Sequence, residues 1–299
     1  MIKRIIDIEN PAYLRIKLDQ LIIEQNNRIE GRIPLEDVGI LILQHPAIVV
    51  SQAVVVSCQE NNIALVFCDK RRLPSAIVLP IFNGNILHSK ILETQFAVTQ
   101  VRKKQIWKQV VRQKITRQSE TLELFGKENS KLQQLAKRVQ SGDKGNCESQ
   151  AARRYWRLLF GENFRRDREL EGVNSLLNYG YAIVRAMVAR AIVGAGLHPA
   201  LGIHHHNQYN GMNLADDVME PFRPWVDRLV YQLSKQKKLE IDRDTKEALL
   251  QIPAQKVIYH KKSMPLMVSC HLLLADLKRA FQDQSIKLQY PVLEDQTLC

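Results

Sequence analysis

The residues that could do chemistry gather in one stretch, residues 196–227, and in one glutamate upstream of it. The stretch supplies imidazoles first and then carboxylates one helical turn apart. Carboxylate oxygens are the ligands that Mg²⁺ and Mn²⁺ prefer, and an imidazole nitrogen makes Mn²⁺ more acceptable. We therefore expect a Mg²⁺ or Mn²⁺ site with open positions for water, phosphate and a hydroxyl group. The candidate side chains are Glu148, His204, His205, His206, Asp217 and Glu220.

Each candidate also has a purely structural interpretation. Glu148 follows Gly-Asn near the start of a predicted helix, where an acid interacts favourably with the helix dipole. Asp217 and Glu220 are three residues apart, so they share one helix face, which could simply be solvated. Pro221 weakens the helical hydrogen bonding beside Glu220 but fixes the local geometry. Three adjacent histidines cannot all reach one point, so at most one or two of them serve the same site.

The charge balance points to an anionic partner. The 299 residues include 43 Lys and Arg against 31 Asp and Glu, which gives a formal net charge of +12. Such an excess favours nucleic acid as the partner, although a basic protein without that role would have the same composition. Together with the metal ligands, the charge predicts metal-assisted chemistry on a nucleic acid.

Membrane insertion and disulfide bonding are not expected. The best apolar stretch, residues 181–197, is interrupted by Arg185 and Arg190, so it falls short of a membrane span. The five cysteines are widely spaced and form no CxxC pair, which indicates reduced thiols in a cytoplasmic protein. The first residues turn polar too early for a secretory signal.

Residues 1–86 are predicted to form a small β domain. Short runs rich in Ile and Val are separated by Asn, Gly or Pro, as strands are separated by turns. A short helix is predicted over residues 51–59, with Ser51 as its N-cap. The predicted strands are residues 2–8, 13–18, 21–24, 38–43, 63–68 and 76–81.

Helical patterns take over after a predicted linker at residues 87–92. The fold class is therefore α+β, with a small N-terminal β-sheet domain followed by a larger all-α domain over residues 93–299. The helical domain contains every candidate metal ligand, so it is the predicted catalytic domain. The predicted helices are residues 94–121, 130–140, 147–160, 174–195, 214–233 and 263–284.

One predicted helix carries seven cations and no acid between Arg102 and Arg117. Lys104, Lys108 and Arg112 recur every four residues and therefore share one helix face. A solvated face is the structural alternative, but several basic clusters flank the predicted metal site. We treat these three residues as candidate DNA contacts, which would release counterions and make the affinity fall with salt.

Three segments carry a resemblance to a known family: GNCESQAARRYWRLLF, NSLLNYGYAIVRAMVARAIVGAGLHPALGIHHH and DDVMEPFRPWVD. Together with the two-part layout, they resemble the CRISPR-associated spacer-acquisition integrase, which inserts new spacers into CRISPR arrays. The resemblance covers most of the chain. It implies that Glu148, His205 and Glu220 hold the metal. Asp217 would be either an additional metal ligand or an acid that contacts one of the ligands.

The resemblance also implies a mechanism and partners. A short double-stranded DNA fragment presents 3′ hydroxyls, and each attacks a phosphodiester at an edge of the CRISPR repeat without ATP. Family members form homodimers through the β domain, and two dimers clamp a small ferredoxin-like dimer in a heterohexamer. Arg223 would orient an acid or contact DNA phosphate, or form a buried salt bridge. The MEPFRP pattern and the compact length look most like the versions that accompany the effector nuclease of prokaryotic type II systems.

The sequence departs from the family pattern at several positions. The GLxP turn usually carries Asp where this chain has His198. An apolar residue usually stands where this chain has Asp216, which could compete for the metal or face solvent. His204 and His206 are additional, so the assignment of the metal-binding imidazole to His205 depends on the register of the motif.

Two other functions would use the same residues. A metal-dependent nuclease that cuts branched DNA in repair would hold the same ligands and take water as its nucleophile. A non-enzymatic DNA-binding scaffold would carry the acids only as structural groups. Strand joining by the protein separates the integrase from both alternatives.

Overall fold

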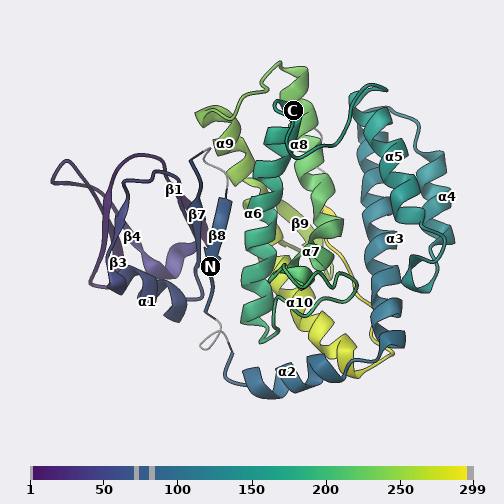
Figure 1. Cartoon of the computed structure of the whole chain (residues 1–299), viewed down its shortest axis with the longest axis horizontal. Helices are drawn as coiled ribbons and strands as arrows, with labels where there is room; N and C mark the ends of the chain where they lie inside the picture. The colour runs from purple at the N-terminus through teal and green to yellow at the C-terminus, as the bar shows by residue number, and fades with distance from the viewer. Residues whose placement is uncertain (1–2, 71–73, 81–84, 295–299) are drawn as a thin grey trace.

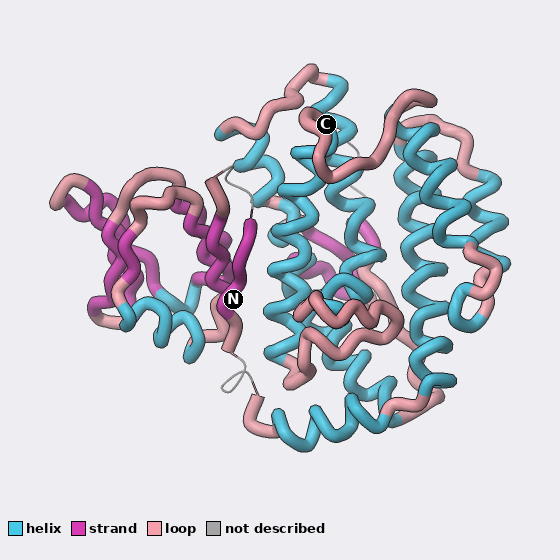
Figure 2. The backbone as a smooth tube through the Cα atoms, viewed as in Figure 1, coloured by secondary structure: helices cyan, strands magenta, loops and turns pink. Residues whose placement is uncertain are grey.

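The computed structural model describes residues 3–70, 74–80 and 85–294. Strands β1–β8 occupy one side of the molecule, and a larger helical body, which also contains a few short strands, occupies the other (Figures 1 and 2). The α+β fold class is therefore confirmed. The predicted strand over residues 76–81 and the predicted strand over residues 2–8 each extend partly outside the described residues.

A four-stranded sheet joins the two sides of the molecule. Its order is β1-β5-β7-β8, with parallel pairing except for the antiparallel β8. Side chains alternate along β5: Ile40 and Ile42 pack into the core of the helical body, while Leu41 and Leu43 pack into the core of the strand region. The residues of β5 form a continuous apolar run because both faces of this sheet are covered. The strands are β1 Arg4–Ile8, β5 Val38–Leu43, β7 Ala64–Cys68 and β8 Pro74–Val78.

A second sheet, with the order β4-β3-β2-β6, covers the outer side of the strand region. Its hairpins turn at Leu18–Asp19 and Asn26–Asn27, where all four residues have positive φ. The short helix α1 (Gln52–Glu60) follows Ser51, as predicted, although the Ser51 side chain makes no capping hydrogen bond. The strands are β2 Tyr13–Lys17, β3 Gln20–Gln25, β4 Arg28–Pro34 and β6 Val49–Val50. β4 and β6 were not predicted.

Helix α6 (Val173–Gly194) forms the centre of the helical body and packs against α7, α8, α9, α10 and the β7–β8 side of the sheet (Figure 1). By length and composition it could cross a membrane, but 83% of its most apolar window is buried inside this fold. It is therefore a core helix. The other helices are α2 His88–Ala97, α3 Gln100–Leu124, α4 Ser130–Arg138, α5 Cys147–Phe160, α7 Asn213–Met219, α8 Arg223–Lys235, α9 Arg243–Leu250 and α10 Leu266–Gln282.

Three details of the sequence prediction were wrong. The predicted linker at residues 87–92 is largely helical, because α2 begins at His88. The helix predicted over residues 94–121 is two helices, and the Thr99 side chain caps the second by accepting the N–H of Arg102. The predicted all-α domain contains a sheet of order β10-β9-β11, formed by β9 Lys256–Tyr259, β10 Lys262–Pro265 and β11 Val292–Leu293. The division into functional domains stays a prediction.

Candidate active site

Helices α3 and α5 bring a lysine and a glutamate together. Glu148 lies in the first turn of α5, where the carboxylate of Asp143 accepts the N–H groups of Cys147 and Glu148 at 2.9 and 3.0 Å. This capping fixes the start of α5. The Glu148 Oε1 atom lies 2.7 Å from the Nζ atom of Lys114 on α3, the long helix that packs beside α5 (Figure 1).

The same ammonium also contacts Glu220. This acid lies in a short 3₁₀ segment, Glu220–Phe222, that separates α7 from α8, so the helix predicted over residues 214–233 is interrupted beside Pro221. Glu220 Oε2 lies 2.5 Å from Lys114 Nζ, and Glu220 Oε1 lies 2.9 Å from Arg223 Nε. Two acids that are far apart in the sequence therefore meet around one cation.

The ion pairs dominate the titration behaviour of this cluster. Burial alone would lower the pKa of Lys114, but the carboxylates of Glu220 and Glu148 outweigh that effect, so the pKa is raised. Burial alone would raise the pKa of Glu220, but Arg223 and Lys114 outweigh it, so that pKa is lowered. Lys114 and Glu220 are consequently held in their charged forms.

Asp217 organises the histidine turn. Its side chain is fully buried, and its Oδ2 atom accepts the N–H groups of Ile203 and His204 at 2.6 and 2.8 Å. Its Oδ1 atom accepts the N–H of His205 at 3.2 Å and lies 2.6 Å from His205 Nδ1. Because both oxygens are engaged, Asp217 positions His205 and does not present a carboxylate to the cavity beside the site.

Gly202 is required where the turn approaches α7. A Cβ atom at this position would lie 2.2 Å from the carbonyl oxygen of His205 and 3.0 Å from Asp217 Oδ2. The backbone oxygen cannot move without displacing the turn. The close approach therefore excludes any side chain at residue 202.

The three adjacent histidines have different surroundings. The His204 ring stacks on Trp107 of α3 with the ring centroids 4.3 Å apart, and burial lowers its pKa. The hydrogen bond with Asp217 raises the pKa of His205, and Glu220 and Glu148 add to the rise through their charges. His206 is exposed. His205 is thus the imidazole that lies in the field of all three acids.

A complete metal-binding triad is not formed in the described part of the chain. There, no group of three or more His, Cys, Asp or Glu side chains is placed so that it could hold a metal ion. The three predicted ligands are only partly brought together. Glu148 and Glu220 both contact Lys114, whereas the Nδ1 atom of His205 contacts Asp217. Two hard carboxylates around a cation, with an imidazole nearby, remain the donor types that suit Mg²⁺ or Mn²⁺.

A cavity of about 630 Å³ adjoins these residues. His205 and Glu220 line it together with four arginines: Arg166, Arg168, Arg185 and Arg223. Four acids also line it, Asp69, Glu169, Asp216 and Glu220, so the wall mixes guanidinium and carboxylate groups. The guanidinium groups are of the type that binds phosphate.

Two polar contacts in the cavity wall were missing from the sequence prediction. Asp216, which we expected to compete for metal or to face solvent, is paired with Arg185 at 2.7 Å. Asn210 accepts a hydrogen bond from Arg185 at 3.0 Å. A partner from another element cannot be deduced from spacing alone, so Arg185 was considered only as an interruption of an apolar stretch.

In the wall of the cavity, the Arg223 guanidinium lies 4.6 Å from the centre of the Tyr181 ring. The hydroxyl groups of Tyr155 and Tyr181 donate to the buried carboxylate of Asp227. Burial raises the pKa of Asp227 to about 6. Arg223 is therefore fixed on one side by Glu220 and on another by an aromatic ring.

The basic helix α3 divides its cations between three roles. Arg102 and Arg117 are buried and donate to backbone carbonyls near the C-terminal end, including those of Ala280 at 2.7 Å and Pro291 at 2.7 Å. Lys114 contacts the two acids. The predicted DNA-binding residues Lys104, Lys108 and Arg112 are exposed, as a contact surface requires.

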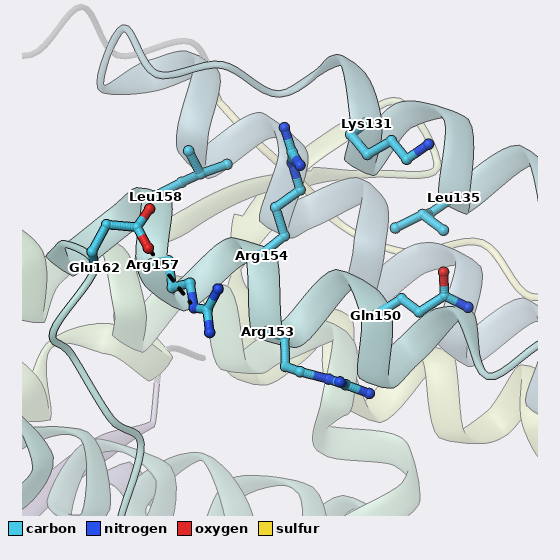
Figure 3. Close-up of a pocket in the computed structure, with 8 residues that line it drawn as sticks. All are labelled: Lys131, Leu135, Gln150, Arg153, Arg154, Arg157, Leu158 and Glu162. Carbon is cyan, nitrogen blue, oxygen red and sulfur yellow. Dashed lines mark ion pairs between the residues drawn. The ribbon is translucent and has the colours of Figure 1, made fainter.

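A further basic groove lies between α4 and α5 (Figure 3). It has a volume of about 440 Å³, and Arg153, Arg154 and Arg157 of α5 face it together with Lys131 of α4. Arg154 pairs with Glu128 at 3.1 Å, and Arg157 lies 3.9 Å from Glu162. The acids reduce the net charge of this groove below what the arginine cluster alone indicates.

Several solved structures share the fold of this chain. It matches a structure described as a casposase bound to its integration product, with a TM-score of 0.79 and 17% identity, over 97% of this chain and 93% of that chain. It also matches a Cas1 protein from Thermotoga maritima, with a TM-score of 0.76 and 15% identity, over 96% and 100% of the two chains. At these identities the likeness concerns the fold alone.

The sequence gives the family. Over 286 residues the chain is 33% identical to the CRISPR-associated endonuclease Cas1 of Neisseria meningitidis serogroup C (strain 8013). The aligned region covers 94% of this chain and 92% of that relative. Residues 6–261 match the family described as CRISPR associated protein Cas1. The chain therefore belongs to the Cas1 family, and the resemblance of the sequence segments is confirmed.

Proposed function

We propose that this protein is a metal-dependent DNA integrase and endonuclease of CRISPR adaptation, which inserts short DNA fragments as new spacers. The observation that carries the proposal is the meeting of Glu148 and Glu220 around one cation, beside a cavity lined by both arginines and acids. Membership of the Cas1 family supports it, as does the 33% identity to the Neisseria meningitidis endonuclease. The shared fold with a casposase bound to its integration product is consistent with it.

The proposed metal site consists of Glu148, Glu220 and His205 and takes Mg²⁺ or Mn²⁺. A divalent cation bound there would polarise a phosphodiester and help to deprotonate an attacking hydroxyl. The hydrogen bond from His205 Nδ1 to Asp217 leaves Nε2 as the nitrogen available for a ligand bond. The ion pair with Arg223 restricts the orientation of the Glu220 carboxylate.

In the proposed reaction, the 3′ oxygen of the fragment forms a bond to phosphorus at the edge of the repeat. The bond from that phosphorus to the 3′ oxygen of the neighbouring nucleotide breaks, and the displaced oxygen takes up a proton. The number of phosphodiester bonds is unchanged, which explains why no ATP is required. Arg166, Arg168 and Arg185 would hold phosphate groups in the cavity.

The proposed assembly follows from the family. We propose a homodimer formed through the strand region, and a heterohexamer of two such dimers with a small ferredoxin-like dimer, on double-stranded DNA in the prokaryotic cytoplasm. A related fold occurs in a solved structure described as a Cas6-RT-Cas1–Cas2 complex, with a TM-score of 0.76 and 19% identity, over 96% of this chain and 36% of that chain. Its description supports a Cas2 partner. Membership of a type II system stays a prediction.

A strand-joining assay tests the function. A labelled DNA fragment with free 3′ hydroxyls is incubated with Mn²⁺ and a supercoiled plasmid that carries the repeat. We expect joined product from the wild type, none from Glu148→Gln or Glu220→Gln, and near-normal DNA affinity in both variants. Glu162→Gln, which changes an exposed acid, is the matched control.

The assay also separates the alternatives. Plasmid cuts without joined product would mean a nuclease that uses water. Normal joining by Glu148→Gln and Glu220→Gln would show that the acids are not catalytic. Loss of DNA affinity together with joining would mean that the two glutamates serve binding instead of chemistry.

A further inference from the structure

Lys114 differs from the other cations of α3 in its surroundings. Its side chain is 12% exposed, and its ammonium contacts carboxylates from two elements that are distant in sequence. Glu148 comes from α5, and Glu220 comes from the 3₁₀ segment between α7 and α8. A lysine that merely makes the helix soluble would extend into solvent, as Lys104 and Lys108 do. The position of Lys114 therefore requires an explanation of its own.

The ammonium and a divalent cation would use the same oxygen atoms. Lys114 Nζ lies 2.7 Å from Glu148 Oε1 and 2.5 Å from Glu220 Oε2, so it occupies the space between the two proposed metal ligands. Two cations that share these oxygens would lie only a few ångströms apart in a partly buried site, where charge repulsion is weakly screened. Simultaneous occupation is therefore strongly unfavourable.

The two carboxylates also need a partner when no metal is bound. Glu220 is nearly fully buried, and an unpaired buried charge is costly. Arg223 contacts the other oxygen of Glu220, at 2.9 Å, so Lys114 is the group that links the two acids. Its charge keeps them from repelling each other.

We propose that Lys114 is a built-in counter-ion that holds Glu148 and Glu220 together and is displaced when the divalent metal binds. The inference rests on the proposed function to the extent that these two acids are the metal ligands. It adds that the lysine lowers the metal affinity and preserves the arrangement of the ligands in the metal-free protein. Lys114 is thus a positioning residue and not a catalytic one.

Direct measurement of Mn²⁺ binding by the full chain tests the proposal. Calorimetric titration with Mn²⁺ compares the wild type with Lys114→Met, which keeps the side-chain volume and removes the charge. We expect Lys114→Met to bind Mn²⁺ tighter by roughly tenfold or more, because couplings between close charge pairs correspond to at least that factor. Its Tm should be lower than that of the wild type in EDTA, and the difference should shrink in saturating Mn²⁺.

The matched control is Lys103→Met, on the same helix but about three turns away, which should leave both the Mn²⁺ affinity and the Tm unchanged. If Lys114→Met does not fold, Lys114→Gln replaces it, with the same expected tightening. Unchanged or weaker Mn²⁺ binding by the neutral variant would overturn the counter-ion proposal alone. A wild type that binds no Mn²⁺ would overturn the proposed metal site and the inference with it.

Discussion

His205 and Asp217 are joined twice: Nδ1 of His205 lies 2.6 Å from Oδ1 of Asp217, and the backbone N–H of His205 donates to the same oxygen at 3.2 Å. The carboxylate therefore fixes both the backbone and the ring of the histidine. An imidazole held in this way presents its other nitrogen in one orientation.

We predict that Asp217→Ala disrupts both stability and strand joining. The change leaves the buried N–H group of Ile203 and the partly buried N–H groups of His204 and His205 without their acceptor, which should cost about 3 kcal/mol of the free energy of unfolding. Chemical denaturation measures this loss. The control Asp244→Ala removes an exposed acid and should change stability by less than about 0.5 kcal/mol. A stable Asp217→Ala variant would refute the positioning role.

We predict that the histidines differ in function. His205→Ala should reduce metal-dependent joining by roughly a hundredfold, which is in the range for losing an interaction made in the transition state. His206→Ala should retain joining, because the motif register assigns the metal contact to His205. His204→Ala should mainly lower the Tm, because it removes the ring stacked on Trp107. Equal losses of joining at all three positions would show that the motif register is wrong.

We predict that the exposed cations of α3 serve DNA affinity. Replacing Lys104, Lys108 and Arg112 together by Ala should weaken binding and reduce the slope of log K against log salt by about 3. The Tm should stay unchanged, because these side chains are exposed. Arg102→Ala is the contrasting variant: it should lower the Tm, because its guanidinium donates to carbonyls that include Ala280 and Asp283. Fluorescence anisotropy at several salt concentrations measures the slope. An unchanged slope would exclude this face of α3 as a DNA contact surface.

We predict that Asp227 makes the stability depend on pH. Burial raises its pKa to about 6 in the folded protein, so the folded state binds its proton more tightly than the unfolded chain does. Stability should therefore fall as the pH rises from about 4 to about 6, by about 2–3 kcal/mol in total. The asparagine in Asp227→Asn cannot ionise, so the variant should lack this pH-dependent loss of stability. If the stability difference between wild type and variant does not change over that pH range, Asp227 is not protonated in the fold.

Much of the fold could be predicted from apolar patterning, and the failures have identifiable causes. The hairpin between β9 and β10 turns at His260 and Lys261, both with positive φ, although neither is a residue that favours such turns. Strand β6 has two residues, too few for a pattern. Strand β4 contains Gly31 and ends at Pro34, both of which weaken the strand signal.

The site could be predicted in residue types but not in contacts. The acids and the histidine stay predicted ligands: Asp217 and Glu220 were proposed from their local spacing, and Glu148 and His205 from the family pattern. Lys114 was counted among seven cations, because nothing in the sequence indicates that one of them would turn inward to meet two acids. The partnership of Arg185 with Asp216 likewise depends on how α6 and α7 pack, which local patterning does not specify.

The central claim is that Glu148 and Glu220 hold a divalent cation with His205. A crystal of the protein soaked in Mn²⁺ tests it through anomalous difference density. We expect one peak at about 2.1 Å from an oxygen of each glutamate and close to His205 Nε2, with the Lys114 ammonium moved away from both acids. A peak elsewhere, or Lys114 still bridging Glu148 and Glu220 in crystals soaked with saturating Mn²⁺, would contradict the account.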